Sequence, residues 1–260
     1  MCILLANQVL RIHAASVKGL IDAIMPALMT RSVFYYLGWY VTLRLLFESS
    51  AETLSTKVDV TFVILIASLN FLSGNSIVWL SITITGIFLL VMSQGADKLK
   101  AAAVVLLALS FNGLWGPLFF DIFAFQLLRA DAAIVGVALS ATQPNMAWGE
   151  TIVGMPDGHS VQIYGPCSSF HNISLGLLCW VSVTKLVRTD WIRSDFLVAL
   201  FVCAAVILLN GARLYLMALS PDHFAYWHDG FGQQLFAWGT TFTVLLMSLR
   251  GAFLCPGRVR

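Results

Sequence analysis

The chain has 260 residues, of which 59% are hydrophobic and only 11% are charged, and its mean hydropathy is +0.85. So few polar side chains would not cover a soluble globule of this size, which places the chain in a lipid bilayer. The net charge of +2 is small, and no nucleic-acid partner is expected from it.

Apolar runs near the roughly 20 residues that a spanning helix needs recur along the chain. We therefore predict an all-α fold: a polytopic transmembrane helical bundle with about seven or eight spans in a single integral membrane domain, residues 1–260. Residues 1–30 mix apolar with charged side chains, so they form either an interfacial helix or an extra span, and no cleaved signal peptide is expected. The other predicted spans are residues 33–47, 59–72, 76–94, 101–125, 168–187, 196–219 and 230–249.

Lysine and arginine predict the orientation of these spans. Basic residues concentrate in residues 95–100, in residues 184–195 and in the tail after Leu249, so these stretches and the C-terminus are expected to be cytoplasmic. The intervening stretches, residues 126–167 and 220–229, are predicted to be extracytoplasmic. With this topology, three residues of different types meet near the outer face of a plasma (inner) membrane: Cys167, Arg213 and His228.

Cys167 lies where a polar stretch ends and an apolar helix is predicted to begin. Pro166 suits the first turn of that helix, which puts the thiol at a helix N-terminus. Unpaired N–H groups and the helix dipole favour negative charge there, so they stabilise a reactive thiolate. Cys179 and Cys203, by contrast, fall inside spans and are expected to pack as small hydrophobic residues.

Arg213 is predicted about two turns before the outer end of its span. An arginine inside a span costs ~2.5–3.5 kcal/mol on insertion scales and indicates a function. The alternative is a side chain that extends to the lipid headgroups. Asn210 lies three residues earlier on the same helix face, where it can orient the guanidinium.

His228 is predicted to open the last helix, between Trp227 and Asp229. Its rival as a base is His171, which follows Cys167 by four residues and would share its helix face. A thiolate that attacks a carbonyl, a histidine that exchanges the proton and an arginine that stabilises an oxyanion together indicate acyl transfer.

Three segments resemble the signature blocks of the exosortase/archaeosortase family, in the same order and at the same helix ends. They are Val161-Gln162-Ile163-Tyr164-Gly165-Pro166-Cys167-Ser168-Ser169, Asn210-Gly211-Ala212-Arg213 and His228-Asp229-Gly230-Phe231-Gly232. The resemblance covers residues 101–249, which are expected to be the catalytic core. One departure is Ser169, where family members often have glycine, so substrate fit near the thiol is expected to differ.

The resemblance implies a membrane cysteine protease or transpeptidase in which Cys167 is the nucleophile, His228 the acid/base and Arg213 the stabilising cation. Its implied substrates are exported proteins with a C-terminal motif, a hydrophobic helix and a basic end, cleaved through a thioester beside membrane lipid. No cofactor is needed for this chemistry. Residues expected to support the site or bind substrate are Ser168, His171, Asn210, Asp229 and Gly232.

Residues 152–164 alternate around Met155-Pro156-Asp157-Gly158 in a pattern typical of a small hairpin. Placed just before Cys167, this hairpin would cap the site or offer an edge to an extended peptide.

Two other interpretations remain at the level of sequence. In a non-catalytic transporter or an exopolysaccharide assembly factor, Arg213 would bind an anionic substrate, and Asp59 and Asp121 are the acids available for an ion pathway. A metal site would use Cys167, His171, His228 and Asp229, but these lack the compact spacing of known metal motifs.

Overall fold

The computed structural model describes residues 32–49, 61–62, 64–66, 68, 74–93, 96–143, 147–155 and 158–254. The predictions for residues 1–30, and for most of the span at 59–72, lie outside this part of the chain. The chain divides into two compact units, Met1–Leu114 and Trp115–Arg260.

In the first unit, helix α6 (Asp97–Ser110) packs against both α3 (Val33–Ser49) and α5 (Asn75–Met92). The face of α6 that carries Ala101, Ala102 and Val105 is buried. The small alanine side chains let the neighbouring helices approach this face closely. After α6, a π-helical turn covers Phe111–Trp115. Within that turn, Asn112 accepts a hydrogen bond from the Tyr35 hydroxyl over 2.5 Å, which ties α3 to the end of α6.

The helix that follows, α7 (Gly116–Thr142), is longer than the sequence predicted. The predicted span ended at residue 125, but no proline occurs over residues 126–142, and the helix ends only before Pro144. Phe123 has non-helical backbone angles (φ −110°, ψ 17°) and marks a kink. Much of the segment predicted to be an extramembrane stretch is therefore helix.

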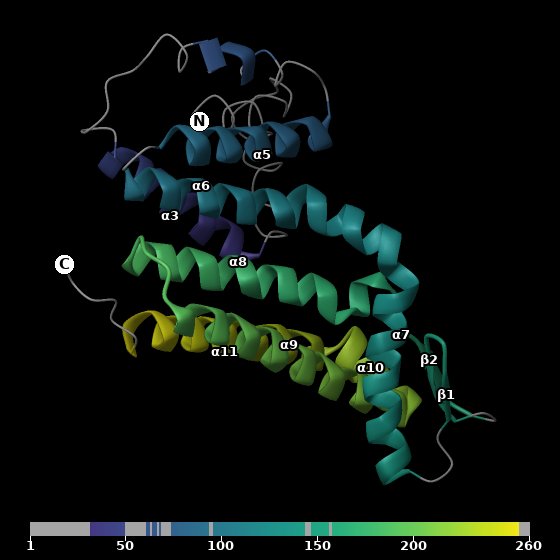
Figure 1. The fold of residues 1–260 in the computed structure, drawn as a ribbon. Coiled ribbons are helices and arrows are strands. Elements are labelled where there is room, and N and C mark those ends of the chain that lie inside the picture. Colours follow the sequence, from purple (N-terminus) through teal and green to yellow (C-terminus); the bar gives the residue numbers. More distant parts are fainter. Residues whose placement is uncertain are drawn as a thin grey trace, which may run out of the picture. The chain divides into compact units, whose positions relative to one another are not determined.

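The core of the second unit is a bundle of three helices. These are α8 (Ser169–Val187), α9 (Arg193–Leu219) and α11 (Phe231–Leu254), which lie side by side in Figure 1 and contact one another. A Cβ at Gly176 would lie 3.2 Å from Val202, so glycine lets α8 and α9 pack at close range.

Between α9 and α11 lies a short helix, α10 (Pro221–His228), which contacts both. Ser220 caps it by accepting a hydrogen bond from the His223 N–H, and Pro221 occupies its first turn. His228 is thus the last residue of α10, and the prediction that it opens the last helix is wrong. The last helix begins only at Phe231.

The predicted hairpin is confirmed and has a third strand. Strands β1 (Ala147–Gly149), β2 (Ile152–Gly154) and β3 (Ser160–Gln162) form an antiparallel sheet in the order β1-β2-β3. Val153 and Val161 pair across β2 and β3 and are buried on the side of α7 and α9. The sheet is therefore anchored by one apolar face.

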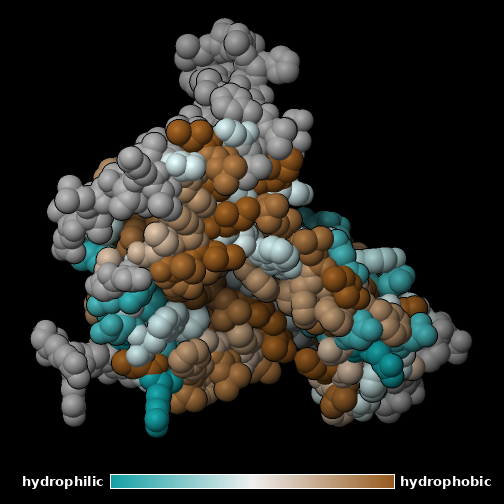
Figure 2. Space-filling view, turned by 45° about the horizontal axis from the view of Figure 1, so that its top comes forward, coloured by the Kyte–Doolittle hydropathy of each residue, from teal (hydrophilic) through white to brown (hydrophobic). Residues whose placement is uncertain are grey.

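Among the residues that the structure describes, four helical stretches are long and apolar enough to cross a membrane: α5, Asp97–Thr142, α8 and α9. Helices α3 and α11 coincide with two further predicted spans but are not among these four. Large apolar side chains are exposed along the bundle, for example Phe201 and Leu208 on α9 and Trp238 and Phe242 on α11. Figure 2 shows such residues over much of the visible face. The chain is a helical integral membrane protein.

One end of the three-helix bundle is held by charged groups. The Lys185 ammonium, 1% exposed, donates to the carbonyls of Thr189 and Asp190 and lies 3.6 Å from the ring centre of Trp191. Arg188 pairs with the buried Asp195 carboxylate and donates to the carbonyl of Ala252 over 2.9 Å.

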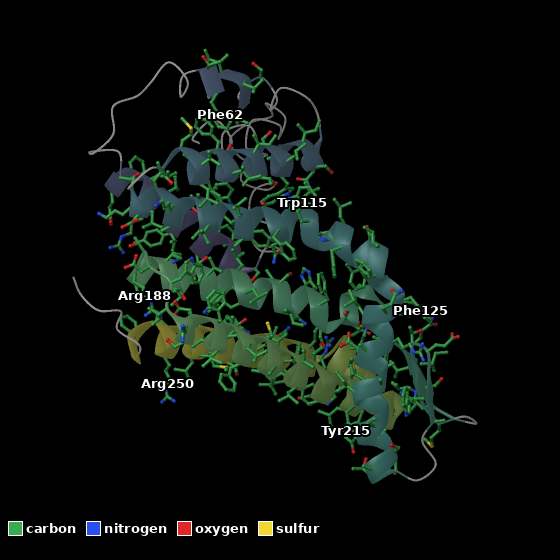
Figure 3. All side chains as sticks on the ribbon, in the orientation of Figure 1. Phe62, Trp115, Phe125, Arg188, Tyr215 and Arg250 are labelled. Atoms are coloured by element: carbon green, nitrogen blue, oxygen red, sulfur yellow. The ribbon has the colours of Figure 1, made fainter. Side chains whose placement is uncertain are left out.

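Arg188 and Arg250 lie at this end of the bundle in Figure 3, whereas Tyr215 lies toward the other. Arg188, from the basic stretch of residues 184–195, and Arg250, the first residue of the C-terminal tail, thus lie at the same end. That this end faces the cytoplasm stays a prediction.

Candidate functional site

Cys167 lies in a short 3-10 turn, Gly165–Cys167, between β3 and α8. Its N–H donates to the carbonyl of Tyr164 over 2.9 Å, and Ser168 caps α8 by accepting from the N–H of Phe170. Cys167 therefore precedes α8, although the sequence had predicted that it opens the helix, because Ser168 takes the capping position. The residue is 7% exposed and lies in an apolar cluster with Ile163 and Leu214.

Asn210 holds the main chain at the cysteine. Its Nδ2 donates to the carbonyl oxygen of Cys167 over 2.8 Å and to Ser169 Oγ over 3.1 Å, and the residue is fully buried. Ser169 is itself buried, so its hydroxyl serves the contact between α8 and α9. The departure from glycine at this position thus has a structural role.

Asp131 on α7 is a second anchor, which sequence reasoning missed. Its Oδ2 accepts hydrogen bonds from Ser168 Oγ over 2.8 Å and from the Ser169 N–H over 3.0 Å, and the residue is buried. A carboxylate is favoured there because the N–H groups that open α8 carry partial positive charge. The sequence did hold a signal, because Asp131 is the one acid in an apolar run. It was passed over because this run was predicted to lie outside the membrane, where an aspartate is ordinary.

Arg213 lies six residues before the end of α9, as predicted, and is 9% exposed. Its Nε donates to the carbonyl oxygen of Trp227 over 3.1 Å, and its guanidinium carbon lies 5.0 Å from the ring centre of Phe236. Cys167 and Asp229 lie near enough to the guanidinium for their charged forms to interact with it. Arg213 therefore connects the cysteine to the segment between α10 and α11.

His228 is the last residue of α10, and 38% of its side chain is exposed. Its Nδ1 is 2.8 Å from Asp229 Oδ1, and its ring stacks on Phe224 with the centroids 4.8 Å apart. An ionised carboxylate only accepts hydrogen bonds, so Nδ1 is the donor and the lone pair of the neutral ring lies on Nε2. Within the described residues, no hydrogen bond joins this imidazole to the Cys167 thiol.

His171 is exposed on α8. Because Cys167 lies outside that helix, the expectation that the two residues share one helix face is wrong.

Gly232 is buried at the start of α11. A Cβ there would lie 2.8 Å from the rings of both Tyr226 and Trp227, so glycine lets α11 begin against α10. It thereby supports the segment that carries His228.

His159 follows the turn between β2 and β3 and links the sheet to two helices. Its Nε2 hydrogen-bonds the carbonyl of Met217 over 3.0 Å, and its ring meets the edge of Phe224 at 6.1 Å. Phe224 in turn stacks on His228.

The structure thus brings Cys167, Asn210 and Arg213 together. His228 is linked to Arg213 through the residue before it, Trp227, whose carbonyl oxygen accepts a hydrogen bond from Arg213, and it hydrogen-bonds the residue after it, Asp229. Of the acids considered for ion transport, Asp121 is exposed on α7 and Asp59 lies outside the described residues. Over the part of the chain that the structure describes, no group of three or more histidine, cysteine, aspartate and glutamate side chains could hold a metal ion.

Fold and site define a helical membrane protein with a buried cysteine, asparagine and arginine at one end of a helix bundle. The family model of the transmembrane exosortases matches residues 29–246, and the chain belongs to this family. The match begins at residue 29, so it extends well beyond residues 101–249, to which the sequence analysis limited the resemblance. No curated protein and no solved structure matches the chain.

Proposed function

We propose that this exosortase-family protein is a cysteine-type peptidase or transpeptidase that cleaves C-terminal sorting signals of exported proteins. One observation carries the proposal: Asn210 on α9 donates a hydrogen bond to the carbonyl oxygen of Cys167, and the buried Arg213 lies one turn further along the same helix. The hydrogen bond fixes the main chain at the cysteine, and Arg213 supplies a buried cation on the same helix. Packing alone would require neither group.

The Cys167 thiolate attacks the carbonyl carbon of the scissile peptide bond, and the carbonyl oxygen becomes an oxyanion. Arg213 stabilises that negative charge, since a preorganised cation in a buried site acts more strongly than one in water. The hydrogen bonds from Asn210 and to Asp131 hold the backbone on both sides of the sulfur during the attack.

His228 takes the thiol proton on Nε2 and later gives it to the leaving amine. Asp229 supports the histidine by accepting from Nδ1, which fixes the tautomer and stabilises the imidazolium. Binding of substrate brings the imidazole from its half-exposed position to the sulfur. The thioester that remains is then attacked by water, which gives hydrolysis, or by an amine or lipid, which gives transfer.

The proposed substrates carry a short motif, a hydrophobic helix and a basic end at the C-terminus. Their helix lies in the membrane against exposed apolar side chains of the bundle, such as those of α9 and α11. Cys167 precedes α8, whereas Arg188 follows it and lies at the same end of the bundle as Arg250, which supports an extracytoplasmic active site by the positive-inside rule.

Coexpression with exported proteins that carry such a signal, tagged at the C-terminus, tests the proposal; processing is scored as loss of the tag. Cys167→Ala and Arg213→Ala should both abolish processing. Cys179→Ala, which changes a buried cysteine within α8, should process like wild type. A protein that works as an anion carrier through Arg213 would tolerate Cys167→Ala and lose its function only with Arg213→Ala.

A further inference from the structure

Strand β3 is an edge of the sheet, because the order β1-β2-β3 leaves it a single strand neighbour. Val161 and Ile163 point their side chains into the apolar cluster, while Ser160, Gln162 and Tyr164 are exposed. The hydroxyl of Tyr164 donates to Gln162 Oε1 over 2.8 Å, so the two exposed side chains lie together on the open face of the strand.

The register decides which backbone groups of β3 are used. The N–H of Ile163 donates to the carbonyl of Thr151 over 2.8 Å, and the N–H of Met155 donates to the carbonyl of His159 over 2.9 Å. Val161, midway between Ile163 and His159, pairs with Val153. In an antiparallel ladder the bonded groups alternate, so His159, Val161 and Ile163 face β2.

Ser160 and Gln162 consequently direct their backbone N–H and C=O groups away from β2, toward the open edge. Within the described residues, no hydrogen bond to these backbone groups is made from another element. Open edges of this kind pair readily with an extended peptide.

This edge leads directly to the proposed nucleophile. β3 ends at Gln162, and the chain reaches Cys167 five residues later through Tyr164 and the 3-10 turn. Because an extended chain rises about 3.3 Å per residue, the Cα atoms of Gln162 and Cys167 are at most roughly 17 Å apart. A strand paired with Gln162 would thus reach the thiol within a few residues.

We propose that the extended segment around the scissile bond of the peptide substrate binds as a fourth strand on the open edge of β3. The backbone groups of Ser160 and Gln162 hold its main chain, and the strand delivers the scissile carbonyl to Cys167. Main-chain pairing supplies affinity, and alternate side chains of the peptide supply specificity. The proposal rests on the proposed function, since it assumes that the substrate is a peptide.

Proline at position 162 tests the edge, because it removes an outward N–H and leaves the hydrogen bonds between β2 and β3 in place. Gln162→Pro should lower the rate of processing roughly tenfold or more, the loss expected from a missing hydrogen bond and a blocked edge. Gln162→Ala, which keeps the N–H but loses the contact with Tyr164, should lose much less. Equal processing by the two variants would overturn the edge proposal while Cys167-dependent cleavage still stands; no cleavage by wild type would overturn the proposed function itself.

A cross-linking scan covers the case in which Gln162→Pro fails to fold. Gln162→Cys is combined with Cys167→Ala so that substrate stays uncleaved, and single cysteines are moved along the substrate segment. A bound strand should form disulfides at every second position, since side chains alternate between faces. Disulfides at consecutive positions, or none, would contradict pairing with β3.

Discussion

Asn210 donates a hydrogen bond to the carbonyl oxygen of Cys167, from a helix that begins only after α8 has ended. Asn210→Asp has nearly the same shape but turns the donor into an acceptor that repels that carbonyl. Processing should fall about tenfold or more, since an unsatisfied buried group costs ~1–3 kcal/mol.

The rate of tag loss measures this effect, and the thermal midpoint in detergent shows whether the variant is folded. Gln234→Glu, the same chemical change at an exposed position on α11, should behave like wild type. Normal processing by Asn210→Asp would show that this hydrogen bond does not position the cysteine.

Asp131 should matter more than an ordinary acid on α7. Asp131→Ala removes the acceptor of Ser168 and of the Ser169 N–H, so the turn that carries Cys167 loses an anchor, and processing should fall roughly tenfold. Asp131→Asn keeps one acceptor oxygen and should recover part of the rate. The matched control is Asp121→Ala, an exposed carboxylate on the same helix. Equal rates for the two alanine variants would remove Asp131 from the positioning role.

His228→Ala should reduce processing by roughly 10²–10⁴-fold, the usual contribution of a general acid and base. Asp229→Asn should give a smaller loss, because it weakens the support of the imidazole without removing it. His223→Ala is the control, since His223 lies on the same short helix and its ring hydrogen-bonds Ser220, which caps that helix. If His171→Ala abolished processing and His228→Ala did not, the base would have been assigned to the wrong histidine.

The pair of Arg188 and Asp195 supports a prediction about stability rather than catalysis. Arg188→Ala leaves a buried carboxylate without its cation and should cost about 3–5 kcal/mol. Arg193→Ala changes an exposed arginine nearby and should cost little. The double variant Arg188→Ala/Asp195→Ala should unfold at a higher temperature than Arg188→Ala alone, and an additive loss would contradict the pairing.

The sequence predicted the helices of the bundle and the hairpin because their signals are local: apolar length, alternation and turn residues. It also singled out Arg213 and Asn210, since a cation and an amide inside an apolar run stand out. The partner expected for Asn210 was wrong, because its amide donates to the carbonyl oxygen of Cys167 and to Ser169 and not to the Arg213 guanidinium. It could not reveal Asp131, whose role depends on α7 passing beside the start of α8, a contact between residues 37 positions apart in the chain.

The separation of α10 from α11 was missed for a related reason. Tyr226, Trp227 and the glycines after them look like a membrane-interface motif, and only the packing of Gly232 against those rings shows a break between two helices. The position of His228 follows from that break.

The intact mass of an exported substrate, coexpressed with wild type and with Cys167→Ala, tests the central claim most directly. We expect that wild type shortens the substrate at one peptide bond, either with a free carboxylate or with the added mass of an acceptor, and that Cys167→Ala leaves it whole. The same shortened product from both proteins, with Cys167→Ala inserted in the membrane at wild-type levels, would contradict Cys167 as the nucleophile.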